Sequence, residues 1–317
     1  MSAVATGGGT IARAHADGRA DGRAELRDAA TVLLVRDGPD GIEAMVLRRN
    51  LRSDFIGGAY VFPGGAIDPG DSDPEAYANC AGLDDADAST RLGIERDGLA
   101  VWVAGVRECF EEAGLLLART RGSERVLSFA DPEVAARFDE HRRAVDDGRR
   151  TLAEVCARED IELAADDLVP VARWITPVVA SRRYDTWFLL GRGPREQVAL
   201  HDDREVIANL WVRPATALAA HRRGELDMMY PTVCLLEWLA AAGSADAALA
   251  AAAALGEITA VEPRIVDDGR GGRLLSVAGD PEYGSAPDAV GPGEHVAGAE
   301  LLRLCRARVL AHHGEGD

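Results

Sequence analysis

The first apolar stretches of the chain predict a β-hairpin. Residues 29–35 form an apolar run, residues 37–41 are dense in Asp, Gly and Pro, and a second apolar run covers residues 42–47. Two such runs joined by turn-forming residues are typical of antiparallel strands. Residues 59–62 then predict a short strand that leads into the turn Pro63-Gly64-Gly65.

Further along the chain, the spacing of apolar residues becomes that of helices. Residues 99–117 have helical character, and Gly114 stands near the expected end. Other predicted helices cover 132–146, 152–158, a stretch from Pro214, a stretch from about Thr232 through the Ala-rich residues 240–255, and an amphipathic stretch at 297–312. Strands are predicted at 169–175, 186–190 and 206–212, with strands and turns at 261–283. Strands before and after a central helix indicate a mixed α/β domain.

Composition and charge narrow the choice of function. Of the 317 residues, 47% are hydrophobic and 28% are charged, as in ordinary globular proteins. The net charge of -18 argues against nucleic acid as a partner, because binding to phosphates needs a basic face. A phosphate-bearing substrate would need metal ions or arginines to offset the local repulsion.

The ends of the chain and its cysteines carry little functional signal. Residues 1–27 are rich in Gly, Ala, Arg and Asp without apolar periodicity, so we expect a flexible tail. The five cysteines include no Cys-x-x-Cys pair, which favours a reducing, cytoplasmic environment over a zinc site or disulfides. No apolar run is long enough for a transmembrane helix, so we expect no membrane partner.

Three glutamates in the predicted helix at 99–117 indicate the chemistry. Glu108, Glu111 and Glu112 are spaced so that they project from one helical face. Their mutual repulsion would be relieved by a hard divalent cation such as Mg²⁺ or Mn²⁺, which prefers oxygen ligands. Arg107 could hold the helix by pairing with a nearby acid. The alternative is a solvated acidic face without a metal, which is common on helices.

The residues around these glutamates resemble the Nudix box, whose pattern is Gly, five residues, Glu, seven residues, then Arg-Glu-U-x-Glu-Glu-x-Gly-U with U apolar. Gly65 supplies the first glycine. The second half of the pattern is matched by Arg107, Glu108, Cys109, Glu111, Glu112, Gly114 and Leu115. The resemblance implies a strand–loop–helix in which Glu108, Glu111 and Glu112 bind metal and Arg107 supports catalysis.

The box departs from the family pattern in two ways. The position of its first glutamate holds Asp71, and 35 residues separate Asp71 from Arg107 where the family has seven, which implies an insertion of 28 residues. A box split in this way after Phe-Pro-Gly-Gly resembles the branch that includes the peroxisomal acyl-CoA diphosphatases. Residues 54–65, 174–177 and 182–186 are also similar to that branch, although Asp54 stands where its coenzyme A signature has an arginine.

This resemblance covers about residues 29–239 and implies a Nudix α/β/α sandwich around a mixed sheet. The expected domains are a tail at 1–27, a Nudix hydrolase domain at 28–240 with an insertion at about 72–98, and a mainly helical C-terminal extension at 241–317. The insertion and the region after Leu239 are both candidates for a lid or a homodimer contact, and the sequence leaves that choice open.

Several other residues are candidates for the substrate site. The backbone amides of Gly64 and Gly65 could approach phosphates closely, because no Cβ intervenes. Arg182 and Arg183 are candidate phosphate clamps, with exposed structural arginines as the alternative. We expect the tryptophans in the core, Cys109 in a packing role, and surface positions for His141, His201 and His221. The general base is one of the three glutamates or an acid from outside the helix.

The expected activity is metal-dependent hydrolysis of a pyrophosphate bond in a nucleotide-type small molecule, with CoA or an acyl-CoA as the first candidate. ADP-ribose, a dinucleotide or a nucleoside triphosphate would be cleaved by the same mechanism. A non-catalytic Nudix-like module that binds a nucleotide is the alternative from another class. Such modules usually lose box residues, whereas Arg107 and all three glutamates are present here. Turnover that depends on a divalent metal would separate the two classes.

Overall fold

The computed structural model describes residues 24–50, 57–199 and 206–283, apart from residues 268, 271 and 282. Eight strands form one mixed sheet in the order β10-β7-β8-β1-β2-β3, with β4 paired to β1 and β9 paired to β2. The strands are β1 (Leu26–Gly38), β2 (Gly41–Arg49), β3 (Tyr60–Val61), β4 (Gly64–Ala66), β7 (Val169–Ile175), β8 (Arg183–Arg192), β9 (Val206–Val212) and β10 (Ala260–Val261). Two small antiparallel pairs, β5 (Ala118–Thr120) with β6 (Ile161–Leu163) and β11 (Arg264–Asp267) with β12 (Arg273–Ser276), lie outside this sheet.

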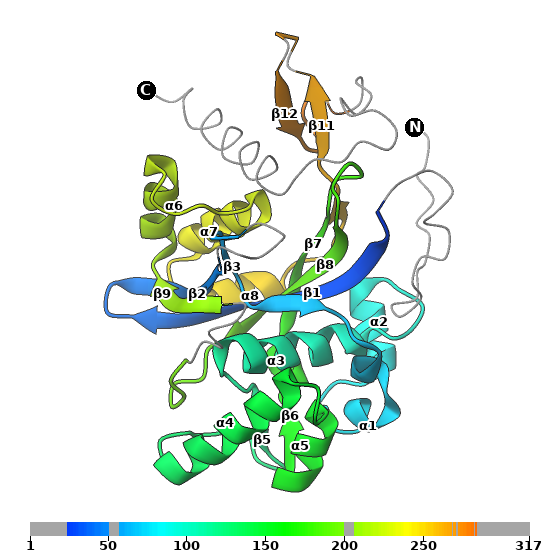
Figure 1. The fold of residues 1–317 in the computed structure, drawn as a ribbon, viewed down its shortest axis with the longest axis vertical. Helices are drawn as coiled ribbons and strands as arrows, with labels where there is room; N and C mark the ends of the chain where they lie inside the picture. The colour runs from blue at the N-terminus through cyan, green and yellow to red at the C-terminus, as the bar shows by residue number, and fades with distance from the viewer. Residues whose placement is uncertain are drawn as a thin grey trace.

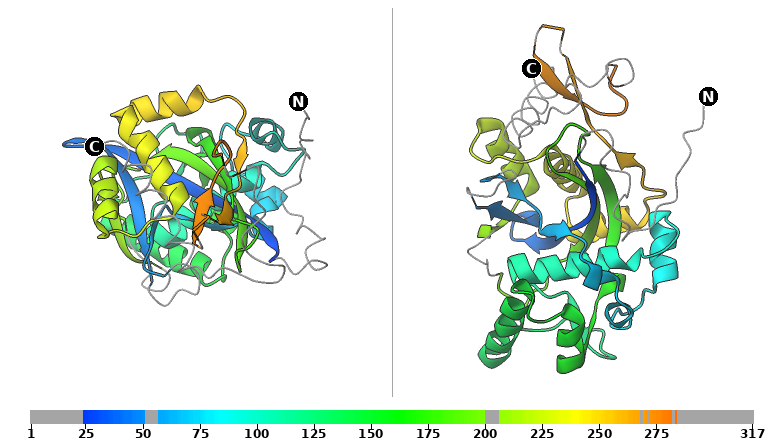
Figure 2. Two further views of the ribbon diagram at one scale, coloured as in Figure 1. Left: turned by 90° about the horizontal axis from the view of Figure 1, so that it is seen from above. Right: turned by 45° about the vertical axis from the view of Figure 1, so that its right-hand side comes forward.

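Helices cover both faces of the sheet, as Figures 1 and 2 show. One face carries α3 (Leu99–Ala113), with α4 (Pro132–Asp146) and α5 (Leu152–Glu159) beyond it. The other carries α6 (Pro214–Arg223), α7 (Tyr230–Ala242) and α8 (Ala245–Ala253). This arrangement confirms the predicted α/β/α sandwich, as well as the predicted helices at 132–146 and 152–158.

The central strand β1 contributes to two separate hydrophobic cores. Val32 and Leu34 belong to the core beneath α3, whereas Leu33 and Val35 belong to the core shared with α7 and α8. Successive side chains of a strand point to opposite faces, so an uninterrupted apolar run is what a strand buried on both faces requires. β1 pairs in parallel with β8 and antiparallel with β2 and β4, which fixes the Gly64–Ala66 segment beside it.

The helix that carries the three glutamates begins at Leu99 and ends at Ala113. Gly114 takes a left-handed conformation with φ of 67° and donates its N–H to the Phe110 carbonyl, and the Leu115 N–H bonds to the Cys109 carbonyl. This is the helix termination that glycine favours, and it ends the helix four residues before the predicted limit at residue 117. At Gly105, an added Cβ would lie 2.8 Å from Val32, so the helix packs closely on β1.

The insertion in the box is helical and folds against the same face as α3 (Figure 1). The 3₁₀ helix η1 (Pro69–Ser72) leads into the insertion, which contains the helices α1 (Pro74–Tyr77) and α2 (Asp85–Leu92); a further 3₁₀ helix, η2 (Ala165–Asp167), follows β6. Asp85 accepts hydrogen bonds from the backbone N–H groups of Asp97 and Leu99, which ties the end of the insertion to the start of α3.

The structure corrects the prediction of one long helix from Thr232 through the Ala-rich stretch. Gly243 has φ of 78° after α7, and the Ser244 hydroxyl caps α8 by accepting from the Ala247 N–H, so the chain bends by 110° between the two helices. Within the described part of the chain, no single helix is long and apolar enough to cross a membrane, and α7 and α8 meet that length and composition only as this bent pair.

The described residues add detail at both ends of the predicted domain plan. Residues 26 and 27 belong to β1, where they pair with Arg183 and Tyr184, so the ordered domain begins before residue 28. In the C-terminal extension, the described residues form α8, β10 and the β11–β12 hairpin, so strands contribute as much as helix there. The predicted helix at 297–312 and most of the predicted tail lie outside the described residues.

Candidate active site

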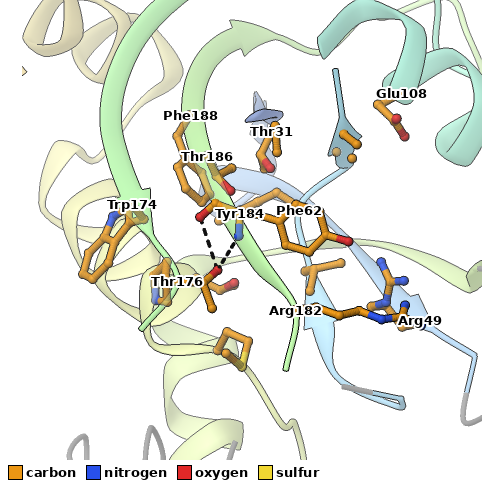
Figure 3. Close-up of a pocket in the computed structure, with 18 of the residues that line it drawn as sticks. Thr31, Arg49, Phe62, Glu108, Trp174, Thr176, Arg182, Tyr184, Thr186 and Phe188 are labelled. Carbon is orange, nitrogen blue, oxygen red and sulfur yellow. Dashed lines mark hydrogen bonds between the residues drawn. The ribbon is translucent and has the colours of Figure 1, made fainter. Parts of the chain in front are cut away.

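A cavity of about 500 Å³ opens beside the end of α3 (Figure 3). Three groups of side chains line it. The acidic region is formed by Asp68, Glu108, Glu111, Glu112 and Asp146. The basic region is formed by Arg49 and Arg182. The apolar region is formed by Trp174, Pro177, Met229, Tyr230 and Leu275. In Figure 3, Glu108 lies on one side of the cavity, Trp174 lies on another, and the two arginines lie together apart from both.

Arg107 organises the acidic region. Its Nε and Nη2 donate to the two carboxylate oxygens of Asp71, each at 2.9 Å, and its Nη1 lies 2.9 Å from oxygens of both Glu108 and Glu111. Nη2 also donates to the Ala66 carbonyl at 2.8 Å. A guanidinium suits this role because its five N–H groups form a rigid fork. Arg107 thus connects the 3₁₀ helix η1, the glycine turn and the glutamate helix.

Asp71 reaches Arg107 despite being shorter than the glutamate of the family pattern. The 3₁₀ helix η1 brings Asp71 into a buried position, where only 3% of the residue is exposed. One of its carboxylate oxygens also accepts from the Asp68 N–H at 2.8 Å. The paired hydrogen bonds to Arg107 cross 36 positions of sequence, so the split box closes in space although it is interrupted along the chain.

The glycine turn and the glutamate helix touch directly. The Gly64 N–H donates to Glu112 Oε2 at 3.0 Å. A Cβ at Gly65 would lie 2.4 Å from Glu108 Oε1, so only glycine leaves room for that carboxylate. The Gly64 amide therefore helps to position the Glu112 carboxylate. The expected approach of the Gly64 and Gly65 amides to a phosphate stays a prediction.

The acidic region holds more negative charge than Arg107 can balance. Burial raises the pKa of Glu108 to about 7, against the opposing effect of Arg107, and burial likewise raises the pKa of Glu111 to about 7. Burial also raises the pKa of Asp71. Removing a carboxylate from water disfavours its charged form unless a cation lies close. Oxygen donors with excess negative charge suit Mg²⁺ or Mn²⁺.

The side chains are nevertheless arranged around Arg107 in this structure. Among the residues it describes, no three acidic, histidine or cysteine side chains are placed to hold one metal ion together. Nη1 of Arg107 bonds both Glu108 and Glu111, while Glu112 is directed to Gly64. The donor chemistry therefore fits a divalent cation, and the assignment of the three glutamates as its ligands stays a prediction.

The two candidate arginine clamps have different environments. Arg182 lines the cavity next to Arg49 (Figure 3). Arg183 donates to the Thr176 carbonyl at 3.3 Å and to Glu262 at 2.8 Å, so its contacts anchor the C-terminal extension and do not support the substrate-binding prediction. Sequence reasoning missed Arg49, because a lone arginine at the end of a strand gives no functional signal before the fold places it.

The histidines that the structure describes are less exposed than the sequence predicts. His141 and His221 are only 3% and 1% exposed, so their predicted surface positions are wrong; His201 lies outside the described residues. His141 is buried because Glu159 binds its Nε2 at 2.8 Å.

Core packing is confirmed for Trp187 and Cys109, which are 1% and 0% exposed, whereas Trp174 lines the cavity. The cavity wall also includes Asp146, at the end of α4. Asp146 is an acid outside the glutamate helix that the sequence did not reveal.

Comparisons with known proteins agree with this geometry. The family model described as the NUDT19 Nudix domain matches residues 83–238. A solved structure of a NUDIX hydrolase from Alicyclobacillus acidocaldarius shares 27% identity and a TM-score of 0.56, covering 74% of this chain and 99% of that one. The chain is therefore similar to Nudix hydrolases in both sequence and fold.

The chain is also similar to proteins named acyl-coenzyme A diphosphatase NUDT19. The Gallus gallus protein is 29% identical over 248 residues, which is 65% of this chain and 65% of the relative. The Homo sapiens protein is 27% identical over 223 residues, covering 61% of this chain and 59% of the relative. The chain thus matches less than two thirds of the length of these relatives.

The Nudix family match begins at residue 83, inside the insertion, so it does not include Gly64, Gly65 or Asp71. In the structure, however, Gly64 is hydrogen-bonded to Glu112, and Asp71 is hydrogen-bonded to Arg107. These contacts show that the residues of the first part of the box lie against those of the second part.

Proposed function

We propose that this Nudix protein hydrolyses the diphosphate bond of CoA or an acyl-CoA with the help of Mg²⁺ or Mn²⁺. The names of the relatives support this substrate class. The observation that carries the proposal is the cavity itself, in which the box carboxylates, two arginines and an apolar wall face one another. A CoA thioester has three matching parts: a diphosphate, a phosphorylated nucleoside and an uncharged tail.

In this proposal, Glu108, Glu111 and Glu112 would hold the divalent cation, which shields the diphosphate and lowers the pKa of a bound water when present. Arg107 fixes Glu108 and Glu111 through its Nη1, and Asp71 fixes Arg107. Preorganised charge of this kind costs no reorganisation during the reaction.

The basic region binds phosphate outside the scissile bond. Guanidinium groups recognise phosphate oxygens with two parallel hydrogen bonds, and two arginines side by side offset the repulsion of a polyanion in an acidic protein. Arg49 and Arg182 occupy that position in the cavity wall. A general base from among the glutamates, or Asp146 in the same acidic region, would accept the proton of the attacking water.

The test is a hydrolysis screen with Mg²⁺ and Mn²⁺ and mass-spectrometric identification of products. The panel holds CoA, acyl-CoAs, ADP-ribose, a dinucleotide and nucleoside triphosphates, with Glu112→Gln as the blank. Release of 3′,5′-ADP and a phosphopantetheine from the CoA compounds would support the proposal. Cleavage of another compound alone would keep the Nudix mechanism and reject CoA, and nucleotide binding without any metal-dependent turnover would favour a binding module.

The remaining predictions from the sequence carry over as proposals. We place the protein in the cytoplasm, with a small-molecule substrate and neither nucleic acid nor membrane as a partner. A homodimer would be detected by light scattering, and the insertion and the C-terminal extension are the regions to examine for its contacts.

A further inference from the structure

The apolar region of the cavity is built from parts of the chain that are far apart in sequence. Tyr230, at the start of α7, packs edge-to-face on Trp174 of β7 with 5.8 Å between ring centroids. Leu275 of β12 is 2% exposed and belongs to a small core with Ile265 that packs against Met229 and Tyr230. This wall is therefore a packed structure that continues into the C-terminal extension.

The C-terminal extension is attached to the sheet at this place. Strand β10 pairs with β7, with Val261 opposite Trp174. Two residues further on, Pro263 lines the cavity. Arg183 of β8 holds Glu262 through a 2.8 Å ion pair, and the Tyr283 hydroxyl donates to the Glu262 carbonyl. These contacts hold the hairpin β11–β12 beside the cavity, so the C-terminal extension forms part of the cavity wall.

The position of the apolar region suits one end of a long substrate. Figure 3 shows Thr31, Thr186 and Phe188 between Glu108 and Trp174, while Arg49 and Arg182 lie in a separate direction. A diphosphate at the carboxylates would direct its phosphorylated nucleoside toward the arginines, because that part carries the remaining charge. The opposite, uncharged end of the molecule would then enter the apolar region.

Three of the five side chains of the apolar region favour an aliphatic occupant over a nucleobase. Pro177, Met229 and Leu275 present carbon and sulfur atoms, which cannot read the polar edge of a base. Met229 adds an unbranched, adaptable side chain that can pack against chains of different length. A lining that is mainly apolar, with a few polar groups placed elsewhere, is also typical of small-molecule sites.

We propose that the apolar region, to which the C-terminal extension contributes Leu275, binds the acyl chain of an acyl-CoA and thereby makes the enzyme prefer acylated CoA to free CoA. This inference rests on the proposed function and adds the residues that set substrate preference. Met229, Tyr230 and Leu275 are the specificity-determining residues, and none of them contacts the scissile bond in this scheme.

The experiment compares kcat/KM for CoA, acetyl-CoA and octanoyl-CoA in the wild-type protein, in Met229→Glu and in Leu255→Glu. Met229 caps the N-terminus of α7, where a carboxylate is favourable to the helix, so the variant is expected to fold. Leu255 is 44% exposed and lies outside the cavity lining, so Leu255→Glu is a control with the same change of charge. Circular dichroism and thermal unfolding establish that each variant is folded.

We expect the wild-type protein and Leu255→Glu to use octanoyl-CoA more efficiently than CoA by about tenfold or more, since apolar groups in a fitted pocket give that scale of discrimination. In Met229→Glu the ratio of the two kcat/KM values should fall by roughly tenfold. Octanoyl-pantetheine, which lacks the diphosphate, should inhibit hydrolysis of octanoyl-CoA by the wild-type protein. It should not inhibit hydrolysis by Met229→Glu.

The outcomes separate the inference from the proposed function. Hydrolysis of CoA and octanoyl-CoA with equal kcat/KM, or an unchanged ratio in folded Met229→Glu, would overturn the acyl site and leave the diphosphatase activity standing. No hydrolysis of any CoA compound by the wild-type protein would reject the proposed function and the acyl site with it.

Discussion

Replacing Gly65 by alanine should damage catalysis far more than folding. The added Cβ would lie 2.4 Å from Oε1 and 2.6 Å from Cδ of Glu108, distances that real Cβ atoms do not show. Both atoms are at the end of a flexible side chain, so the carboxylate can rotate away. That movement breaks its 2.9 Å contact with Arg107 and displaces one of the predicted metal ligands.

The two effects have different magnitudes. A side chain forced from its preferred rotamer costs about 0.5–1.5 kcal/mol, which is a small loss of stability. A displacement of about 1 Å in a catalytic group can lower the rate by roughly a hundredfold. We therefore expect Gly65→Ala to unfold in urea close to the wild-type midpoint and to show kcat/KM at least about a hundredfold lower.

Gly64→Ala is the matched comparison. Its Cβ would lie 2.5 Å from the Ala30 carbonyl and 2.7 Å from the Thr31 Cα, and these backbone atoms of β1 cannot rotate away. Overpacking typically costs about 1–3 kcal/mol, so this variant should lose stability before it loses anything else. The reasoning is refuted if Gly65→Ala retains activity within a few-fold of the wild type, or if the two variants are equally destabilised.

Three further predictions concern single side chains. Glu112→Gln should stay folded and lose about a thousandfold in kcat, as expected when ~4 kcal/mol of transition-state stabilisation is lost at 1.4 kcal/mol per tenfold; near wild-type turnover would contradict its role. Arg183→Gln should leave the Nudix core stable but increase hydrogen exchange in residues 260–276, whereas unchanged exchange there would show that its ion pair does not anchor the extension. At Glu159, burial acts to raise the pKa, but hydrogen bonds from His141 and Arg137 outweigh it, so the pKa lies below the ordinary 4.5. Glu159 therefore stabilises the fold above about pH 4.5 and loses this contribution as the pH falls through its lowered pKa; the difference in unfolding free energy between the wild type and Glu159→Gln should shrink in acid, and a constant difference would exclude this linkage.

Local sequence was sufficient for much of the fold because the relevant forces act over short distances along the chain. The apolar run of β1, the left-handed Gly114 and the proline at the start of α6 are each local signals, and each predicted its element. The spacing of Glu108, Glu111 and Glu112 likewise places them on one helical face without knowledge of the rest.

Contacts between distant segments could not be predicted in the same way. Arg49 joins the cavity only because the end of β2 lies near the residues that precede β8. Leu275 becomes part of the cavity wall only when β10 pairs with β7. His141 looks polar and exposed by its neighbours, yet α5 supplies Glu159 and encloses it. Each of these depends on tertiary packing, which local patterns do not encode.

The alternating side chains of β1 have a consequence for how the protein comes apart. Val32 and Leu34 pack in one core, and Leu33 and Val35 pack in the other. If either layer of helices detached, it would expose one face of β1, whose other face still packs against the second layer. The two halves should therefore melt in one cooperative step, and the amides of β1 should exchange only through global opening. A truncation of any one of these four residues would then lower the same melting temperature, whichever face it points to.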